Sequence, residues 1–444
     1  MNFASKSFSF LQRDAFLFIT NIITSICIAR YLGPTLLGVW VIINLIPSYA
    51  DLFFRTKADA AAVYYLSKNI YDINEVVYVL NILAILSSFI VIIPIILFND
   101  WFISFLFDHH PQQQVRTYVF IILFQIPLNF IFSNYQYLHA FKEDIKSMNL
   151  MTITRAISSS AIILILLIFF NQGLMSVAVG STFGILIAVV IAVGRLQYKK
   201  RTVRTIDFVL VKDLLKYGFK LYIANMLSHI NLYASQAIVI AYCAPAQVAF
   251  FSIAQQMGQL VNKFSDAMAV FLFPRISKET NQTVSSDLAS KAYRVTLVML
   301  LPIIMVAPFL FYPLIYLIYG ESYVAVVYPF FIILPGLILS AAASNLGMFF
   351  QGVGRADLIA KISFVPLIVQ IALGLLLVPQ FGIIGAALSF LFSLLSTFIT
   401  QLIVFNKYQD HPFRKTLIIS KNDFMIVKEF IVHLIGNRFK WFIR

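Results

Sequence analysis

Polar side chains recur at helical spacing inside otherwise apolar stretches of this sequence. One set lies at intervals of four, three and four residues and consists of Asn44, Ser48, Asp51 and Arg55. These intervals place the side chains on a single face of a helix. Because a charged group at the centre of a membrane costs at least about 2.5 kcal/mol on insertion scales, such a face usually borders a water-filled cavity.

A second set repeats these intervals 211 residues later (262 − 51 = 211) and consists of Gln255, Gln259, Asn262 and Asp266, with Lys263 beside them. Other polar positions in apolar stretches are Gln125, Asn129, Ser133 and Gln136, then Ser340, Ser344 and Gln351, then Asn225, Ser228, His229, Ser235 and Gln236. Matching stripes on four helices predict a hydrated cleft between two bundles. The competing interpretation is that hydroxyl and amide groups join helices by hydrogen bonds, and that Asp51 pairs with Arg55.

The elements that carry these stripes must be membrane helices. The chain has 444 residues, of which 60% are hydrophobic and only 12% are charged, whereas soluble domains carry about 25% charged residues. Only helices and closed barrels can span a bilayer, because every backbone polar group must be paired internally. Long uninterrupted apolar runs, without the alternation of barrel strands, indicate an all-α polytopic membrane protein.

Stretches without Asp, Glu, Lys or Arg locate most of the spans, each of which needs about 20 residues. Three stretches have the length of one helix: residues 76–99, 117–141 and 295–320. Three longer stretches contain turn residues and predict helical hairpins: 156–194, 221–262 and 362–406. Together with a hairpin at Gly33-Pro34 and a helix within 322–354, they predict about twelve transmembrane helices.

The positive charge is distributed unevenly between the loops. If the N-terminus is cytoplasmic, the outer loops carry only Arg30 and Arg116, and 33 − 2 = 31 Lys and Arg lie in or near cytoplasmic loops. This asymmetry predicts cytoplasmic N- and C-termini. It also explains the net charge of +14 as topology, so we expect a lipid bilayer and no nucleic acid as partner.

The sequence also contains an internal repeat. Tyr31-Leu32-Gly33-Pro34 aligns with Tyr242-Cys243-Ala244-Pro245 at an offset of 211, and Gly173-Leu174 aligns with Gly382-Ile383 at an offset of 209. Two six-helix bundles would both enter the membrane from the cytoplasm, as parallel repeats. The predicted domains are an N-terminal bundle, a basic cytoplasmic linker, a C-terminal bundle and a basic cytoplasmic tail with an interfacial helix, at residues 1–196, 197–213, 214–406 and 407–444.

Catalytic and cofactor motifs are missing from the sequence. It has no Gly-rich phosphate loop, no His-Glu-x-x-His and no nucleophile elbow, so we predict that the chain is not an enzyme. His109-His110 in the longest outer loop lacks further nearby ligands, so we expect a solvated loop and no metal site. No cofactor is expected, and any uphill transport would depend on an ion gradient, with H⁺ or Na⁺ both open.

Four short segments resemble motifs of the polysaccharide biosynthesis and export proteins, the oligosaccharide flippases of the multidrug/oligosaccharidyl-lipid/polysaccharide (MOP) superfamily. The segments are Ala29-Arg30-Tyr31-Leu32-Gly33-Pro34, Phe273-Pro274-Arg275-Ile276-Ser277, Tyr319-Gly320-Glu321-Ser322-Tyr323 and Gln351-Gly352. The resemblance covers nearly all of the chain up to Asn406. It implies a V-shaped pair of bundles, similar to the multidrug (MATE) transporters, around a central cavity.

The resemblance further implies that the protein flips an undecaprenyl-pyrophosphate-linked oligosaccharide from the inner to the outer leaflet by alternating access. Cationic cavity residues would meet the pyrophosphate, because guanidinium groups bind phosphate oxygens in bidentate fashion. The candidates are Arg30, Arg55, Lys263 and Arg155. The polar lining would be Asn44, Ser48, Asp51, Gln125, Asn129, Asn225, His229, Gln255, Gln259, Asn262 and Asp266. Association with a glycan polymerase and chain-length proteins is left open.

Three alternatives remain at this point. A multidrug cation exporter of the same superfamily would need acidic residues deep in one bundle, whereas the deep charges here are few and mixed. A lipid II flippase usually has two more spans than the twelve counted. A membrane-embedded glycan polymerase or ligase would need a large catalytic outer loop.

Overall fold

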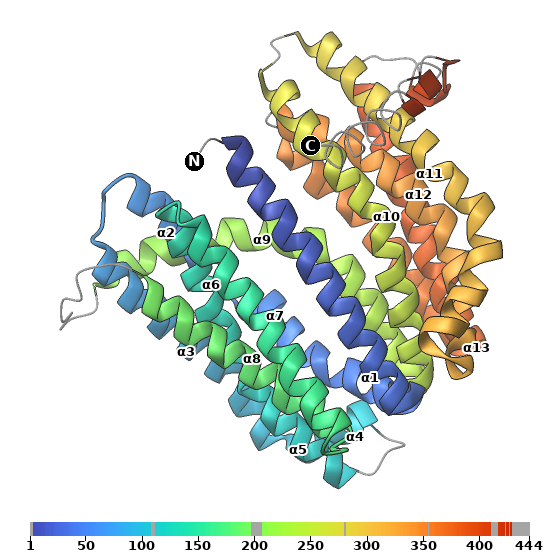
Figure 1. Cartoon of the computed structure of the whole chain (residues 1–444). Helices are drawn as coiled ribbons and strands as arrows, with labels where there is room; N and C mark the ends of the chain where they lie inside the picture. The colour runs from blue at the N-terminus through green and yellow to red at the C-terminus, as the bar shows by residue number, and fades with distance from the viewer. Residues whose placement is uncertain are drawn as a thin grey trace, which may run out of the picture. The chain divides into compact units, whose positions relative to one another are not determined.

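The protein is helical throughout the part of the chain that the structure, a computed structural model, describes (Figure 1). The described residues are 3–107, 112–196, 207–278, 281–353, 355–409, 416–421, 423–425 and 427–428. His109-His110, most of the predicted linker and the end of the tail lie outside these ranges. The helices fall into two compact units, which are described separately.

The first unit comprises Met1–His229 and Ala244–Ala249. Its helices are α1 (Phe3–Phe54), α2 (Ala58–Ser67), α3 (Ile73–Leu97), α4 (Asn99–Phe107), α5 (Gln112–Leu123), α6 (Gln125–Phe141), α7 (Ile145–Ile168) and α8 (Leu174–Arg195), and it includes the first part of α9 (Phe208–Tyr242). The division between the units therefore falls within α9, after His229.

The second unit comprises Ile230–Cys243 and Phe250–Arg444. Besides the end of α9 it contains α10 (Pro245–Lys278) from Phe250 onward, α11 (Gln282–Tyr319), the short 3₁₀ helix η1 (Glu321–Val326), α12 (Val327–Gly352) and α13 (Ala356–Gln409). Three prolines lie within α11, where neighbouring helices can satisfy the backbone groups that proline leaves unpaired.

The helix count agrees with the sequence-based prediction of about twelve spans. Eight helices of the described residues are long and apolar enough to cross a membrane. Two of them, α1 and α13, are broken where Gly33 (φ +72°) and Gly382 (φ +56°) leave helical geometry, which gives 8 + 2 = 10. The more polar α9 and α10, at 35 and 34 residues, bring the total to 10 + 2 = 12. Both glycine breaks lie at predicted turns.

Large apolar side chains cover the outside of these helices. Leu97, Phe169, Phe309 and Leu317 are each at least 72% exposed within the structure. An aqueous surface of this kind would be strongly unfavourable, whereas hydrocarbon chains of a bilayer solvate it readily. The protein is therefore a multi-pass membrane protein.

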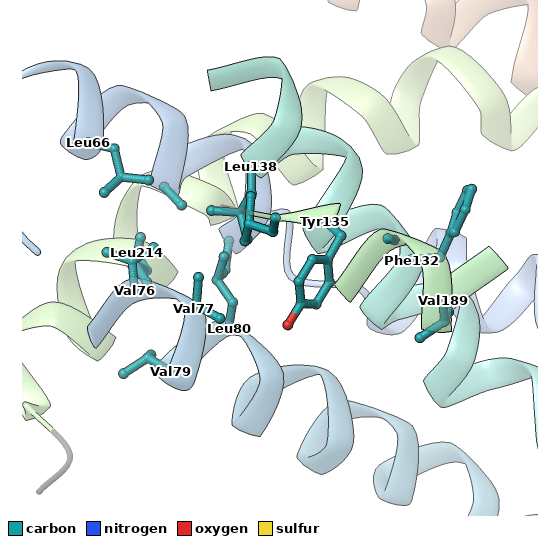
Figure 2. Packing of buried hydrophobic residues seen from close by; sticks show 14 of the residues in the cluster. Leu66, Val76, Val77, Val79, Leu80, Phe132, Tyr135, Leu138, Val189 and Leu214 are labelled. Atoms are coloured by element: carbon teal, nitrogen blue, oxygen red, sulfur yellow. The ribbon is translucent and has the colours of Figure 1, made fainter. Parts of the chain in front are cut away.

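A buried apolar cluster joins α2, α3, α6, α8 and the start of α9 in the first unit. Figure 2 shows Leu66, Val76, Leu80, Leu138 and Leu214 among its members. The hydroxyl of Tyr71 donates to the Asp213 carboxylate at 2.6 Å and fixes α9 at the edge of the cluster. This packing places the first turn of α2 against α6 and the start of α9 against the end of α1.

Candidate functional site

A turn between α1 and α2 carries Arg55, one of the predicted cations. Because α1 ends at Phe54 and α2 begins at Ala58, Arg55 lies just beyond the end of α1, the helix that carries the other residues of its polar stripe. Its Nη1 donates to Oδ1 of Asp51 at 2.7 Å, one helical turn back. Its Nε lies 3.8 Å from Oδ2 of Asp59, one turn ahead. Arg55 therefore bridges two carboxylates, of which the sequence analysis named only Asp51.

Asp59 is the more deeply buried of the two carboxylates, at 1% exposure. The Ser133 hydroxyl of α6 donates to its Oδ2 at 2.8 Å, and the backbone N–H of Ala60 donates to its Oδ1 at 2.8 Å. It also lies in the first turn of α2, where the helix dipole favours negative charge. These contacts compensate a carboxylate that would be costly to bury alone.

Lys57 is a second cation of the same turn and is 7% exposed. Burial lowers the pKa of the Lys57 ammonium, and the charge of Arg55 lowers it further, whereas the carboxylates of Asp51 and Asp59 act in the opposite direction. Its backbone adopts a left-handed conformation, with φ +54°, which is strained for a residue with a side chain. The turn thus holds a buried cation at a cost in both conformation and solvation.

Arg155 on α7 adds a third cation. Its Nη2 donates to Oδ1 of Asn129 at 3.0 Å, and its guanidinium carbon lies 5.2 Å from the centroid of the Phe132 ring. Asn129 lies one helical turn before Ser133 on α6, and Ser133 donates to Asp59. Three cations and two carboxylates make up this charged cluster, which therefore carries a net charge of 3 − 2 = +1: Asp51, Arg55, Lys57, Asp59 and Arg155.

A cavity of about 710 Å³ opens beside the cluster, between the end of α1 and the start of α9. Its lining residues are Phe53, Phe54, Arg55, Thr56, Leu215, Lys216, Phe219 and Tyr222. It combines aromatic and aliphatic walls with the cations Arg55 and Lys216, and all of its lining residues belong to the first unit. This Arg55–Lys216 cavity suits a ligand with an apolar and an anionic part.

Other predicted residues of the first unit lie elsewhere. Arg30 is exposed and precedes the break at Gly33, so the 21-residue helix 34–54 separates it from Arg55 by roughly 30 Å. Asn44 is exposed, and the Ser48 hydroxyl donates to its backbone oxygen at 3.0 Å. Gln125 donates to Ser181 and Thr182 of α8 at 2.6 and 3.0 Å, a contact that joins helices.

In the second unit the predicted residues form a neutral arrangement around Gln255. Its amide donates to the Ser235 hydroxyl, and the Gln236 amide donates to its carbonyl, both at 3.4 Å. Gln259 and Lys263 are exposed, and Asn262 is half-buried. His229, which belongs to the first unit, is also exposed. The side chains of Asn225 and Asp266 lie outside the described residues.

Sequence reasoning missed the central residue of another hydrogen-bond network in the second unit. Asn345 is fully buried, and its amide donates to the hydroxyls of Ser265 at 3.2 Å and Thr296 at 3.1 Å. Ser265 and Ser344 also contact each other at 2.6 Å. The network joins α10, α11 and α12. The one member of the network that the sequence analysis had named was Ser344, a residue of a predicted polar stripe that directly precedes Asn345.

Among the described residues, no group of three or more His, Cys, Asp or Glu side chains is arranged to hold a metal ion. The charged cluster offers the cations Arg55, Lys57 and Arg155 beside its two carboxylates. Guanidinium and ammonium groups of this kind recognise phosphate and carboxylate groups.

Comparison with known proteins reveals related sequences and folds. The chain matches the family model described as polysaccharide biosynthesis protein over residues 27–328, which is 302 of 444 positions. It is 22% identical over 375 residues to a Shigella flexneri protein named "Putative O-antigen transporter", covering 82% of this chain and 88% of that protein. The family resemblance in the short motifs is thereby confirmed.

Solved structures share the fold. The lipid II flippase MurJ in an inward closed conformation matches with a TM-score of 0.78 at 16% identity, over 96% of this chain and 92% of that one. A MATE family multidrug resistance transporter of the MOP superfamily, in an inward-facing conformation, matches with a TM-score of 0.68 at 14% identity, over 90% and 96%. These matches confirm the predicted all-α, MATE-like fold.

Proposed function

The chain belongs to the polysaccharide biosynthesis protein family, and we propose that it is a flippase for a lipid-linked oligosaccharide. The proposed substrate is an O-antigen, capsule or exopolysaccharide repeat unit on undecaprenyl pyrophosphate. It moves from the inner to the outer leaflet of the cytoplasmic membrane by alternating access. The relative named as an O-antigen transporter supports the substrate class.

The observation that carries this proposal is the cation excess of the charged cluster. A pyrophosphate diester presents two negative charges, and Arg55 and Arg155 can each donate several hydrogen bonds to phosphate oxygens. Asp51 and Asp59 hold Arg55 in place when no substrate is bound. Pyrophosphate oxygens would compete with these carboxylates, so that substrate binding loosens the turn between α1 and α2.

The proposed orientation places both termini in the cytoplasm, as the loop charges indicate. The Arg55 end of helix 34–54 then faces the cytoplasmic leaflet, where the lipid-linked sugar is made, and Arg30 faces the outer leaflet. The two arginines would meet the pyrophosphate at different stages of its passage, and Lys263 would meet it from the second unit. Coupling to an H⁺ or Na⁺ gradient completes the proposal.

The charge of the cluster also separates this function from export of cationic drugs. A site with excess positive charge disfavours a cationic substrate, because unpaired like charges in a desolvated pocket repel strongly. The charged cluster has the opposite sign. It therefore supports an anionic substrate.

Translocation by the purified protein in vesicles tests the proposal. A labelled polyprenyl-pyrophosphate oligosaccharide is supplied in the inner leaflet, and its exposure to an impermeant sugar-modifying enzyme is followed with and without imposed ion gradients. Exposure that depends on the protein is the expected result. Exposure equal to that of empty vesicles, together with pumping of a cationic dye, would identify a drug exporter instead.

A further inference from the structure

The start of α9 packs unusually closely on the turn that carries Arg55. A Cβ atom at Gly218 would lie 2.7 Å from the carbonyl oxygen of Thr56 and 3.1 Å from the backbone nitrogen of Ala58. A side chain at this position would therefore push α9 away from the turn. Glycine allows the two backbones to approach directly, so that residues 215–222 of α9 stand opposite residues 53–56.

A hydrogen bond joins α9 to α1 at the same junction, and a ring contact within α9 lies beside it. The hydroxyl of Tyr222 donates to the backbone oxygen of Phe53 at 3.2 Å. The rings of Phe219 and Tyr222 stack with their centroids 6.0 Å apart and their planes at 24°. The hydrogen bond thus links the α1 side of the Arg55–Lys216 cavity to its α9 side, and the stacking orders two of the rings that line it.

The lining of this cavity is divided chemically. Four aromatic rings contribute to it, and three of them are substantially exposed: Phe53 at 43%, Phe54 at 41% and Phe219 at 59%. The cations Arg55 and Lys216 also line it, together with Thr56 and Leu215. Within the described part of the chain, no carboxylate lies within ion-pair distance of Lys216.

We propose that the Arg55–Lys216 cavity binds the pyrophosphate and the first isoprene units of a polyprenyl-pyrophosphate lipid. The phosphates lie between the guanidinium of Arg55 and the ammonium of Lys216, and the isoprenoid chain lies on the rings of Phe53, Phe54 and Phe219. This inference rests on the proposed flippase function. It adds a docking site in which the end of α1 and the start of α9 hold the head of the lipid, and Arg55 links this site to the charged cluster.

The physical reasons favour this ligand over its two components. Arg and Lys together can balance a pyrophosphate, but two partly solvated cations bind free pyrophosphate weakly because water competes for the same hydrogen bonds. Aromatic walls bind an uncharged isoprenoid without fixing its head. A molecule with both parts gains from both interactions within one site, which raises its affinity above that of either part.

Photolabelling of the full-length protein in nanodiscs of phosphatidylcholine tests the site. The probe is a benzophenone-bearing analogue of geranylgeranyl pyrophosphate, and the competitors are geranylgeranyl pyrophosphate, inorganic pyrophosphate, geranylgeraniol and phosphatidylglycerol. The variants are Lys216→Gln and Phe219→Ala. Their matched controls, Lys212→Gln and Phe208→Ala, change exposed residues of the same helix that do not line the cavity.

We expect labelling of peptides that contain residues 53–56 or 215–222, and competition by geranylgeranyl pyrophosphate at a concentration at least tenfold lower than by the other three. Lys216→Gln should weaken binding about tenfold, as expected for loss of one charge-assisted hydrogen bond. Phe219→Ala should weaken it several-fold, and both controls should bind like the wild type.

Two results would overturn the site. One is unchanged binding in both Lys216→Gln and Phe219→Ala, and the other is equal competition by phosphatidylglycerol or by inorganic pyrophosphate. Vesicle translocation by the wild type separates this inference from the function on which it rests. Translocation with unchanged binding in the variants rejects only the docking site, whereas site-specific binding without translocation rejects only the flippase function.

Discussion

The two helical units carry the same Ser-Asn pair at corresponding positions. Ser133-Asn134 lies on α6 and Ser344-Asn345 lies on α12, at the repeat offset of 345 − 134 = 211. Both asparagines are buried, and each donates to a neighbouring element: Asn134 to the backbone oxygen of Leu80 at 2.9 Å, Asn345 to two hydroxyls. The pair is therefore a shared device for joining helices.

The partners of the serines differ between the units. Ser133 donates to the Asp59 carboxylate of the charged cluster, whereas Ser344 contacts the neutral Ser265 hydroxyl. Buried charge is expensive, and a neutral network can join helices equally well. The difference is what we expect if the first unit keeps its charges for the proposed substrate, while the corresponding part of the second unit serves packing.

Removal of the buried carboxylate should give the largest effect. Asp59→Asn leaves Arg55 and Lys57 with one carboxylate between them, so we expect a loss of about 3 kcal/mol in the free energy of unfolding and a strong loss of translocation. Denaturant unfolding in mixed micelles measures the first, and the vesicle assay measures the second. Asp14→Asn, which changes an exposed carboxylate at 62% exposure, is the control. If Asp59→Asn were as stable as the wild type, the proposed contrast between a charged first unit and an uncharged second unit would be wrong.

Disruption of the uncharged hydrogen-bond network around Asn345 should reduce stability less and leave translocation nearly unchanged. Asn345→Ala leaves the Ser265 and Thr296 hydroxyls without their amide donor, so we expect a loss of about 1 kcal/mol in stability. Translocation should stay within about twofold of the wild type, because no substrate contact is lost. Gln256→Ala, an exposed position of α10, controls for loss of an amide. Loss of translocation at unchanged stability would assign a substrate role to the second unit as well.

Lys57 permits a pH test of the charged cluster. Its lowered pKa means that the folded protein binds its proton less tightly than the unfolded chain, so stability should rise as the pH passes the lowered value towards the ordinary 10.5. Lys57→Met should raise the free energy of unfolding by about 1 kcal/mol at neutral pH and lower translocation. The difference in free energy of unfolding between Lys57→Met and the wild type should disappear as the pH rises towards 10.5. A variant that is less stable at every pH would show that Lys57 stabilises the turn.

Loss of the Asp423 contacts that hold the tail on α11 should have the smallest effect on stability and translocation. Burial alone would raise the pKa of Asp423, but the backbone N–H and hydroxyl of Ser420 and the Arg294 guanidinium together hold it below its ordinary value of 3.8. Docking of the described tail residues 416–421, 423–425 and 427–428 on α11 should therefore weaken as the pH falls through this lowered pKa.

Asp423→Asn imposes the same weakening at neutral pH. We expect faster hydrogen exchange at residues 416–428, a change below about 1 kcal/mol in global stability and normal translocation. Lys421→Gln, at an exposed position, should exchange like the wild type. Loss of translocation in Asp423→Asn would extend the functional site to the tail.

Local features of the fold were predictable from the sequence because they depend on neighbouring residues. The breaks at Gly33 and Gly382 follow from glycine and proline chemistry, and the Asp51–Arg55 pair follows from helical spacing. The interfacial helix proposed for the tail remains a prediction, because most of that segment lies outside the described residues.

Long-range features of the site could not be predicted in this way. Asp59 lies beyond the turn that ends α1, and its partner Ser133 is 74 residues away, so no periodicity connects them. Lys216 belongs to a basic segment that the charge distribution already explained as topology. Gln125 shows the opposite case, since its place in a polar stripe predicted a cavity but its contacts with α8 fit helix packing.

The central claim is that the charged cluster of the first unit recognises the pyrophosphate. It is tested most directly by the translocation rate of Arg55→Gln, Arg55→Lys and Arg116→Gln at equal expression in vesicles; Arg116 is an exposed arginine of the same unit outside the cluster. We predict at least a tenfold loss in Arg55→Gln, partial activity in Arg55→Lys and wild-type activity in Arg116→Gln. Wild-type rates in Arg55→Gln, or equal losses in Arg55→Gln and Arg116→Gln, would contradict the claim.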